Sequence, residues 1–250
     1  MKKPYIKKYG VVAGFTVWIV DGRYIRNNID EEFPNYGQNY QFPFIPKNEF
    51  WIDREGVHGE EKYYIDSMLV VNKLMAEGLS HEKAVEKADE IERRERAKSR
   101  LFKKELKEER EKKDIIDEIH KRLLKKYSNK KIKVWIVDGE AVRDFFFLDF
   151  NQGGNGYVYH FIPKDEIWID DDLNRREIKF VILHELHESR LMKKGWGYAF
   201  DEFTPAVIKN AEKNKNKKRS AHFSASKIEL YCRKHPETTE KKIREELRRI

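Results

Sequence analysis

The residues best suited to chemistry are clustered in the segment FVILHELHESRLM, residues 180–192. Within it, His184, Glu185, His187 and Glu188 occupy a span of five positions. Helical residues four apart project from the same face, so His184 and Glu188 can bind one ion together. Glu185 lies about 100° around the helix from His184, which is where metalloproteases place a general base beside the metal. The segment predicts a metal site with Glu185 as the candidate catalytic residue.

Further ligands must come from other parts of the chain. His222 is the best candidate for a third ligand, because it lies on the next expected helix. Glu229 is two turns further along the same face, and we expect it to be a ligand or the orienting partner of one. His187 and His160 are weaker candidates for an additional ligand. Imidazole and carboxylate ligands predict a divalent metal, zinc first, with manganese or iron as alternatives.

Two other interpretations of this segment stay open. Two histidines and two glutamates on one helix can form a solvated polar face with no ion. They can also hold a structural metal or a purely polar network without catalysis. The metal-dependent reaction, if there is one, would be hydrolysis, in which the ion activates a water and Glu185 accepts its proton.

The chain also contains an internal repeat. The motif VWIVDG occurs at Val17–Gly22 and again at Val134–Gly139. IPKNEFWID at Ile45–Asp53 matches IPKDEIWID at Ile162–Asp170 with the same spacing. We therefore interpret the chain as two tandem copies of one module.

A later block, Ala84–Glu92, aligns with Ala221–Glu229 only after a gap, so the second copy carries an insertion near Tyr198–Arg219. This insertion is either a lid over the site or a tolerated surface loop. The five candidate ligand and base positions differ between the copies. His184, Glu185, His187, Glu188 and His222 align with Ser67, Met68, Val70, Val71 and Val85. Only Glu229 has an acidic counterpart, Glu92, so the first copy is predicted to be a degenerate version without metal ligands.

Each copy is expected to be α+β, with a small antiparallel sheet and two helices. In the second copy, the apolar runs FFFLDF, YVYHFIP and EIWID are predicted strands between turn-forming residues. Residues 174–194 have the apolar spacing of a helix that ends at Gly195, and residues 221–233 form the next helix. The predicted divisions are 10–92 for the first repeat, 93–131 for a charged helical linker, 132–235 for the second repeat and 236–250 for a charged helical tail.

The linker is rich in Lys, Arg and Glu and lacks Gly and Pro, which predicts a long charged helix or two in succession. It is either a solvated spacer or an arm that forms a coiled coil or contacts nucleic acid. In the first copy, Tyr36, Tyr40, Phe42 and Phe44 either pack a sheet or stack on bases.

The run from IWID through LHELHE resembles the core of zincin-like metallopeptidase domains, in the minimal layout of the ImmA/IrrE type. The longer pattern HELxE…AHxxAxxxE resembles small uncharacterised archaeal and phage proteins. The first resemblance implies a metal held by His184 and a carboxylate, with Glu185 polarising the bound water. Glu188 stands where these peptidases have their second histidine.

The amino-acid composition limits the possible cellular settings and binding partners of the protein. A single cysteine, Cys232, excludes an internal disulfide and predicts a reducing, cytoplasmic setting. The sequence contains no apolar run long enough to be a signal peptide or a membrane span, so we expect neither. The net charge of +8 permits nucleic acid as a partner through a basic surface. Two functions follow: a metal-dependent hydrolase, or a non-catalytic duplicated scaffold of viral origin that binds nucleic acid or protein.

Overall fold

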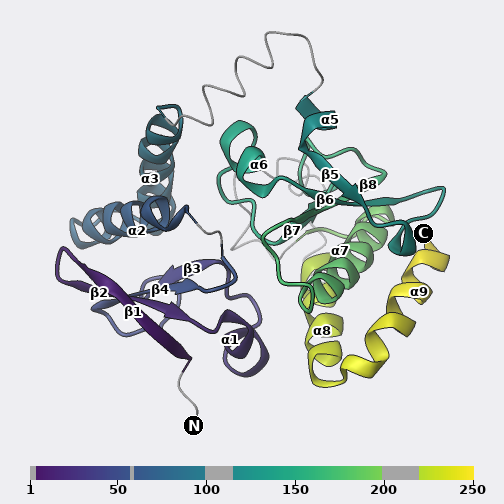
Figure 1. Ribbon diagram of the computed structural model, residues 1–250, viewed down its shortest axis with the longest axis horizontal. Coiled ribbons are helices and arrows are strands. Elements are labelled where there is room, and N and C mark those ends of the chain that lie inside the picture. The colour runs from purple at the N-terminus through teal and green to yellow at the C-terminus, as the bar shows by residue number, and fades with distance from the viewer. Residues whose placement is uncertain (1–3, 57–58, 99–114, 199–219) are drawn as a thin grey trace. The chain divides into compact units, whose positions relative to one another are not determined.

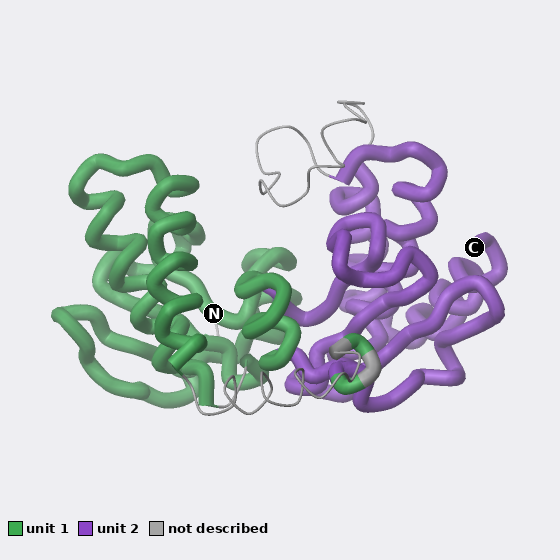
Figure 2. Tube along the Cα trace, turned by 90° about the horizontal axis from the view of Figure 1, so that it is seen from above, with its two compact units in different colours: residues 1–118, 140–149 green, residues 119–139, 150–250 purple. Residues whose placement is uncertain are grey.

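The computed structural model describes residues 4–56, 59–98, 115–198 and 220–250. The chain divides into two compact units (Figures 1 and 2). Unit 1 comprises Met1–Glu118 and Glu140–Asp149, and unit 2 comprises Ile119–Gly139 and Phe150–Ile250. Each unit contains one four-stranded sheet and packed helices, which confirms the mixed α+β class.

The sheet of unit 1 has the strand order β1-β2-β4-β3. Its strands are β1 (Tyr5–Val12), β2 (Phe15–Val20), β3 (Tyr36–Gln38) and β4 (Glu49–Asp53). The central pair, β2 and β4, is parallel, with Trp18 opposite Trp51. The two outer strands pair antiparallel to it.

The sheet of unit 2 has the matching order β5-β6-β8-β7. Its strands are β5 (His120–Leu123), β6 (Lys133–Val137), β7 (Gly153–Asn155) and β8 (Glu166–Asp170). Again the central pair, β6 and β8, is parallel, with Trp135 opposite Trp168. Both units therefore share strand order and strand direction.

The prediction of an antiparallel sheet is wrong for the central strand pair of each unit, which is parallel. In unit 1, the chain between β2 and β4 contains the short helix α1 (Gly22–Asn28) and strand β3, so β4 returns in the direction of β2. In the second repeat, EIWID forms β8, but FFFLDF and YVYHFIP lie outside strands. Their side chains fill the core from loops instead, as the buried Phe150 and Ile162 show.

Helices cover the sheets in both units. Unit 1 has α2 (Glu61–Ala76) and α3 (His81–Arg96), and unit 2 has α7 (Ile178–Lys193), α8 (Ala221–Lys234) and α9 (Thr239–Arg249). The predicted apolar face of α7 is confirmed, since Ile182 and Leu186 are fully buried against the sheet. The helix ends where expected, because Gly195 adopts φ +85° and the amide of Trp196 donates to the Leu191 carbonyl 3.1 Å away.

Within its described residues, the charged segment between the repeats is only partly helical. After α5 (Ile115–Ile119), the chain forms β5 and then the single turn η1 (Lys125–Tyr127). The helix expected through this stretch is wrong for residues 120–127, because β5 pairs antiparallel with β6 as the edge of the sheet. Residues 99–114 of the predicted linker lie outside the described residues, as do residues 199–219 of the insertion.

The predicted tail is part of the packed body of unit 2. After the turn η3 (Pro236–Thr238), α9 buries Ile243 in the same core as α7. The short helix α6 (Gly139–Phe145) follows β6, yet residues 140–149 belong to unit 1. None of the described helices is long and apolar enough to cross a membrane.

The aromatic residues of the first repeat mostly pack its core. Phe42 is buried with Phe33, Phe44 packs on that cluster, and Tyr36 stacks on Tyr64 with 4.4 Å between ring centroids. Tyr40 is exposed. The packing interpretation therefore holds for three of the four candidate base-stacking residues.

Candidate metal centre

Two helices of unit 2, α7 and α8, supply the candidate ligands. His184, Glu185 and Glu188 lie on α7, close to where that helix crosses the sheet. His222 lies in the first turn of α8, and Ser220 caps the start of this helix. The Ser220 hydroxyl accepts a hydrogen bond from the Phe223 amide, 3.0 Å away. The cap fixes the start of α8, and α8 packs closely along α7.

Three side-chain atoms of these residues converge. His184 Nε2 is 3.1 Å from His222 Nδ1, and His222 Nδ1 is 2.9 Å from Glu188 Oε2. His184 Nε2 and Glu188 Oε2 are 3.5 Å apart. The predicted set of His184, Glu188 and His222 is thus brought together, with one available atom from each residue.

These separations fit a small ion. Four tetrahedral ligands at zinc-like bond lengths of about 2.0–2.2 Å lie roughly 3.3–3.6 Å from one another. The separation of His184 Nε2 from Glu188 Oε2 already lies in this range, and the two separations that involve His222 Nδ1 are shorter by roughly a few tenths of an ångström. Two imidazoles and one carboxylate leave one tetrahedral position for water or substrate, which is the pattern of catalytic zinc sites.

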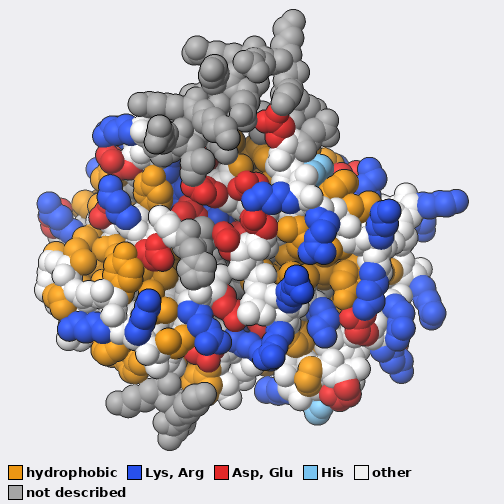
Figure 3. All heavy atoms as spheres, in the orientation of Figure 1, with side chains coloured by type: hydrophobic (Ala, Val, Ile, Leu, Met, Phe, Trp, Pro, Cys, Tyr) orange, Lys and Arg blue, Asp and Glu red, His pale blue; other side chains and the backbone are white. Residues whose placement is uncertain are grey.

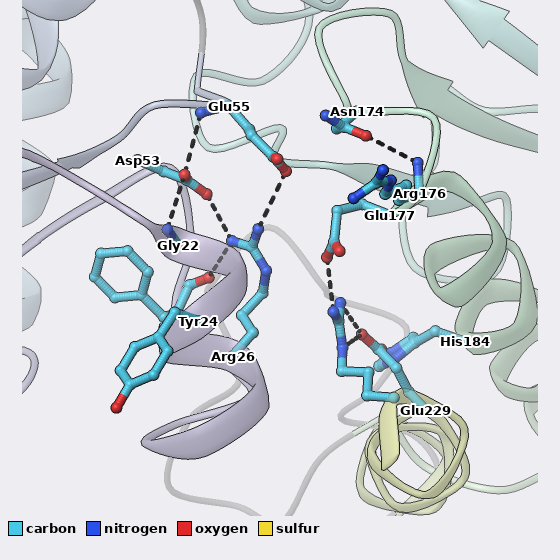
Figure 4. Close-up of polar contacts among 12 residues, drawn as sticks. Gly22, Tyr24, Arg26, Asp53, Glu55, Asn174, Arg176, Glu177, His184 and Glu229 are labelled. Atoms are coloured by element: carbon cyan, nitrogen blue, oxygen red, sulfur yellow. Dashed lines mark hydrogen bonds and ion pairs between the residues drawn. The ribbon is translucent and has the colours of Figure 1, made fainter. Parts of the chain in front are cut away.

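A buried chain of charges orients His184 from behind (Figure 4). Its Nδ1 donates to Glu229 Oε2 at 2.8 Å, which leaves Nε2 directed at the other ligands. Arg233 donates to the second oxygen of Glu229 at 2.9 Å and to Glu177 at 2.7 Å. Glu229 therefore has the orienting role predicted as one of its two alternatives.

Asn155, at the end of β7, links the two glutamates of α7. Its Nδ2 donates to Glu188 Oε1 at 2.8 Å and to Glu185 Oε2 at 2.9 Å. Its Oδ1 accepts from the Tyr157 amide, 3.0 Å away, which fixes the orientation of the side-chain amide. Asn155 thus occupies one oxygen of Glu188 and leaves the other to face the histidines.

The charges of the cluster favour a cation. Burial disfavours the charged imidazole, but hydrogen bonds to Glu188 and Glu229 outweigh it and raise the pKa of His184 well above its ordinary value. Burial opposes ionisation of Glu188, but His184 and His222 lower the pKa of this carboxyl to about 2. A proton is thus held where the three ligand atoms meet.

Glu185 differs from its neighbour. Burial, followed by the charge of Glu188, raises the pKa of Glu185 to about 7. A carboxyl that titrates near neutrality suits a general base. Its side chain is not part of the three-atom ligand group.

Two of the weaker candidates lie elsewhere. His187 faces α9, where its Nδ1 is 3.0 Å from Glu246 Oε1, and its Nε2 is 2.9 Å from the Ser224 hydroxyl. His160 is exposed and contacts the ring of Phe161. Neither residue belongs to the ligand group. A second group of carboxylates, Asp170–Asp172, is contiguous in sequence, and Lys121 pairs with its Asp171.

Three supporting residues were not predicted: Asn155, Arg233 and Glu177. For Asn155 the only signal was the glycine-rich run QGGNG. The glycines there permit close packing, since a Cβ on Gly153 would lie 2.8 Å from the Trp168 carbonyl oxygen. For Arg233 and Glu177 the signal was the repeat itself, because Arg96 and Glu60 occupy the corresponding places in unit 1.

Unit 1 contains the same buried group of one arginine and two glutamates, which we call the Arg–Glu–Glu frame, but not the candidate ligands. Arg96 pairs with Glu60 and, at 2.9 Å, with Glu92, as Arg233 does with Glu177 and Glu229. The position of Glu185 is taken by Met68, which is buried in the sheet core, and that of Glu188 by Val71, which packs with Val85. Apolar packing thus occupies the place of the candidate ligand group.

No protein-family model, curated protein or solved structure matches this chain.

Proposed function

We propose that unit 2 binds one divalent metal ion through His184, Glu188 and His222, with zinc as the first expectation and manganese or iron as alternatives. The observation that carries this proposal is the convergence of three ligand atoms at 2.9–3.5 Å from one another. A carboxylate that orients a ligand histidine from behind is common at metal sites, and Glu229 is placed to do this.

We further propose that the bound metal serves hydrolysis. The side chain of His222 is 26% exposed, so the cluster reaches the surface at that residue. A metal-bound water next to Glu185 would transfer its proton to that carboxylate, and the ion would polarise the carbonyl or phosphoryl oxygen under attack. The alternative is a structural ion in a non-catalytic scaffold.

The two units are best explained as copies of one module, with the metal site confined to the second. Support comes from the shared strand order and from the buried Arg–Glu–Glu frame in both units. The candidate ligands correspond to apolar or small residues in unit 1, which makes unit 1 a natural internal control.

The metal proposal is tested by elemental analysis of the purified chain and by titration with zinc. We expect about one equivalent in the wild type and almost none in His184→Ala. Ser67→Ala, the corresponding change in unit 1, is the matched control and should retain the metal. A wild-type chain that takes up no zinc, manganese or iron after metal-free preparation would overturn the proposal.

The hydrolysis proposal needs a separate measurement. Zinc-loaded protein should cleave p-nitrophenyl acetate or bis(p-nitrophenyl) phosphate, which probe carbonyl and phosphodiester chemistry. Glu185→Gln should retain the metal and lose about 100-fold or more in rate, because it keeps the shape but cannot accept a proton. Equal rates in the wild type and in this variant would favour the structural ion.

A further inference from the structure

The net positive charge of the chain comes from unit 2 alone. Unit 1 carries 24 Lys and Arg against 27 Asp and Glu, whereas unit 2 carries 28 against 17. The net charges are therefore −3 for unit 1 and +11 for unit 2. A charge asymmetry between two parts of one chain is typical of proteins that bind a polyanion with one part.

Two distant segments of unit 2 come together beside the sheet. The connection between β5 and β6 lies against α9, where the Tyr127 hydroxyl donates to Glu240 at 2.9 Å. The side-chain amide of Asn129 donates to the Leu247 carbonyl oxygen at 3.0 Å. Leu124, Tyr127 and Leu247 pack on the same core, so the two segments form one continuous surface.

This surface is strongly basic. We call it the basic surface and define it by six exposed side chains: Lys125 and Lys130 from the connection, Lys133 at the start of β6, and Lys241, Arg244 and Arg248 from α9. The three from α9 are spaced i, i+3 and i+7, which places them on one face of the helix. Figure 3 shows Lys and Arg gathered over the part of unit 2 that carries β5, β6 and α9.

The cations of the basic surface are not used within the fold. Among the described residues, none of the six side chains forms an ion pair or a side-chain hydrogen bond. The nearby Glu240 is already paired with Lys126 and Tyr127, and Glu246 is buried against Arg190. The six charges therefore repel one another with little compensation, which an anionic partner would relieve.

Folding does not require these lysines either. The corresponding connection in unit 1 is the tight turn at Ala13 and Gly14, with φ values of 48° and 87°. That turn joins β1 to β2 without any charged residue. A short turn suffices to close the hairpin, so the longer lysine-rich connection of unit 2 needs another explanation.

We propose that the basic surface binds the phosphate backbone of nucleic acid. Six unpaired cations on two adjoining segments can contact several phosphates at once, and each contact releases bound counterions. A lipid surface fits less well, because membrane-bound basic helices also insert large apolar side chains. The exposed large apolar residues described in unit 2 are Phe223 and Tyr231, both on α8. This inference does not depend on the metal site.

The test is the affinity of the full chain for a fluorescein-labelled DNA duplex, measured by anisotropy over a series of salt concentrations. The variant replaces Lys130, Lys133 and Arg248 by Glu. The matched control makes the same change of charge in unit 1, at the exposed Lys8, Lys47 and Lys87. Circular dichroism checks that both variants fold.

We expect the wild type to bind with a Kd that weakens steeply with salt. The basic-surface variant should weaken binding by about tenfold or more and reduce the salt slope by about 3, one for each lost phosphate contact. The unit 1 control should change the Kd less than about threefold. Equal losses in both variants would overturn the assignment to this surface. Binding to phosphatidylserine vesicles but not to DNA or RNA would overturn the choice of nucleic acid.

Discussion

At the scale of single residues, the geometry of the candidate metal centre depends on the hydrogen bonds that the Asn155 side-chain amide donates. Asn155 donates both amide hydrogens to carboxylates, one on Glu185 and one on Glu188. Glu188 therefore presents a single oxygen to the histidines, while Glu185 is held beside them. Two buried carboxylates would otherwise repel each other in this place.

We expect Asn155→Ala to weaken zinc binding by about 10- to 100-fold, as the loss of an orienting partner does at other metal sites. Competition against a chromogenic chelator measures the change. Gln38→Ala, at the corresponding strand position of unit 1, is the control and should leave zinc affinity unaltered. Identical affinities for the wild type and Asn155→Ala would show that Glu188 needs no such orientation.

Residue types and helical spacing predicted which three candidate ligands converge, because His184 and Glu188 are one turn apart, and because His222 lies on the helix that follows. Asn155 was not predictable in this way. Its role depends on contacts with α7, some thirty residues away in the chain, and an asparagine in a glycine-rich run is an ordinary turn signal. His160 was misjudged because its segment is a loop rather than an inward-facing strand.

At the scale of elements, α9 is joined to α7 by a buried ionic contact. Glu246 accepts from His187 at 3.0 Å and pairs with Arg190. Burial raises the pKa of Glu246, but His187 and Arg190 outweigh it and bring that pKa down to about 2. The ionised form is thus favoured in the folded state.

This shift predicts a pH dependence of stability. Above about pH 4.5, Glu246 is ionised both folded and unfolded, and its contacts contribute fully. As the pH falls towards about 2, the unfolded chain takes up a proton first, so the contribution is lost. Glu246→Gln should lower the free energy of unfolding by at most about 3 kcal/mol at pH 7, and by much less at pH 3.

Denaturant unfolding at the two pH values measures this difference. Glu245→Gln, the neighbouring change on α9, serves as the control. A deficit that is the same at pH 7 and pH 3 would show that packing, rather than the charge of Glu246, joins the two helices.

Strong periodic signals gave the right elements, and weak ones did not. The helix α7 and the strands VWIV and EIWID were predicted because their apolar residues follow one period. Strand β5 was missed because its residues, HKRL, are mostly charged; it is an edge strand held by backbone pairing with β6. Strands β3 and β7 have three residues each, too few to show any alternation.

At the scale of the whole molecule, the boundary between the repeats does not coincide with the boundary between the units. The helix α6 belongs to the second repeat by sequence, but residues 140–149 pack in unit 1. There, Asp144 pairs with Arg96 at 2.9 Å, and Arg143 pairs with Glu60 at 2.7 Å. Unit 1 is thus completed by a segment that follows the first strands of unit 2.

We expect Asp144→Asn to destabilise unit 1 by about 3 kcal/mol, because it removes one partner from a buried cluster of charges. Hydrogen–deuterium exchange of the unit 1 amides measures the effect. Asp138→Asn is a matched control six residues earlier in the chain, where Asp138 pairs with Lys121 near the surface, and should cost less than about 1 kcal/mol. Similar exchange rates in both variants would contradict a structural role for α6 in unit 1.

The Arg–Glu–Glu frame present in both units has a consequence for the proposed metal site of unit 2. Arg96, Glu60 and Glu92 assemble in unit 1, whose described residues include no group of candidate metal ligands, so the same frame in unit 2 can form before an ion binds. Folding and metal loading are then separate events, unlike in zinc fingers, which are unfolded without metal. The folded chain would then bind its metal reversibly. The ion bound would depend on the metals available, and a chelator would remove it without unfolding the protein.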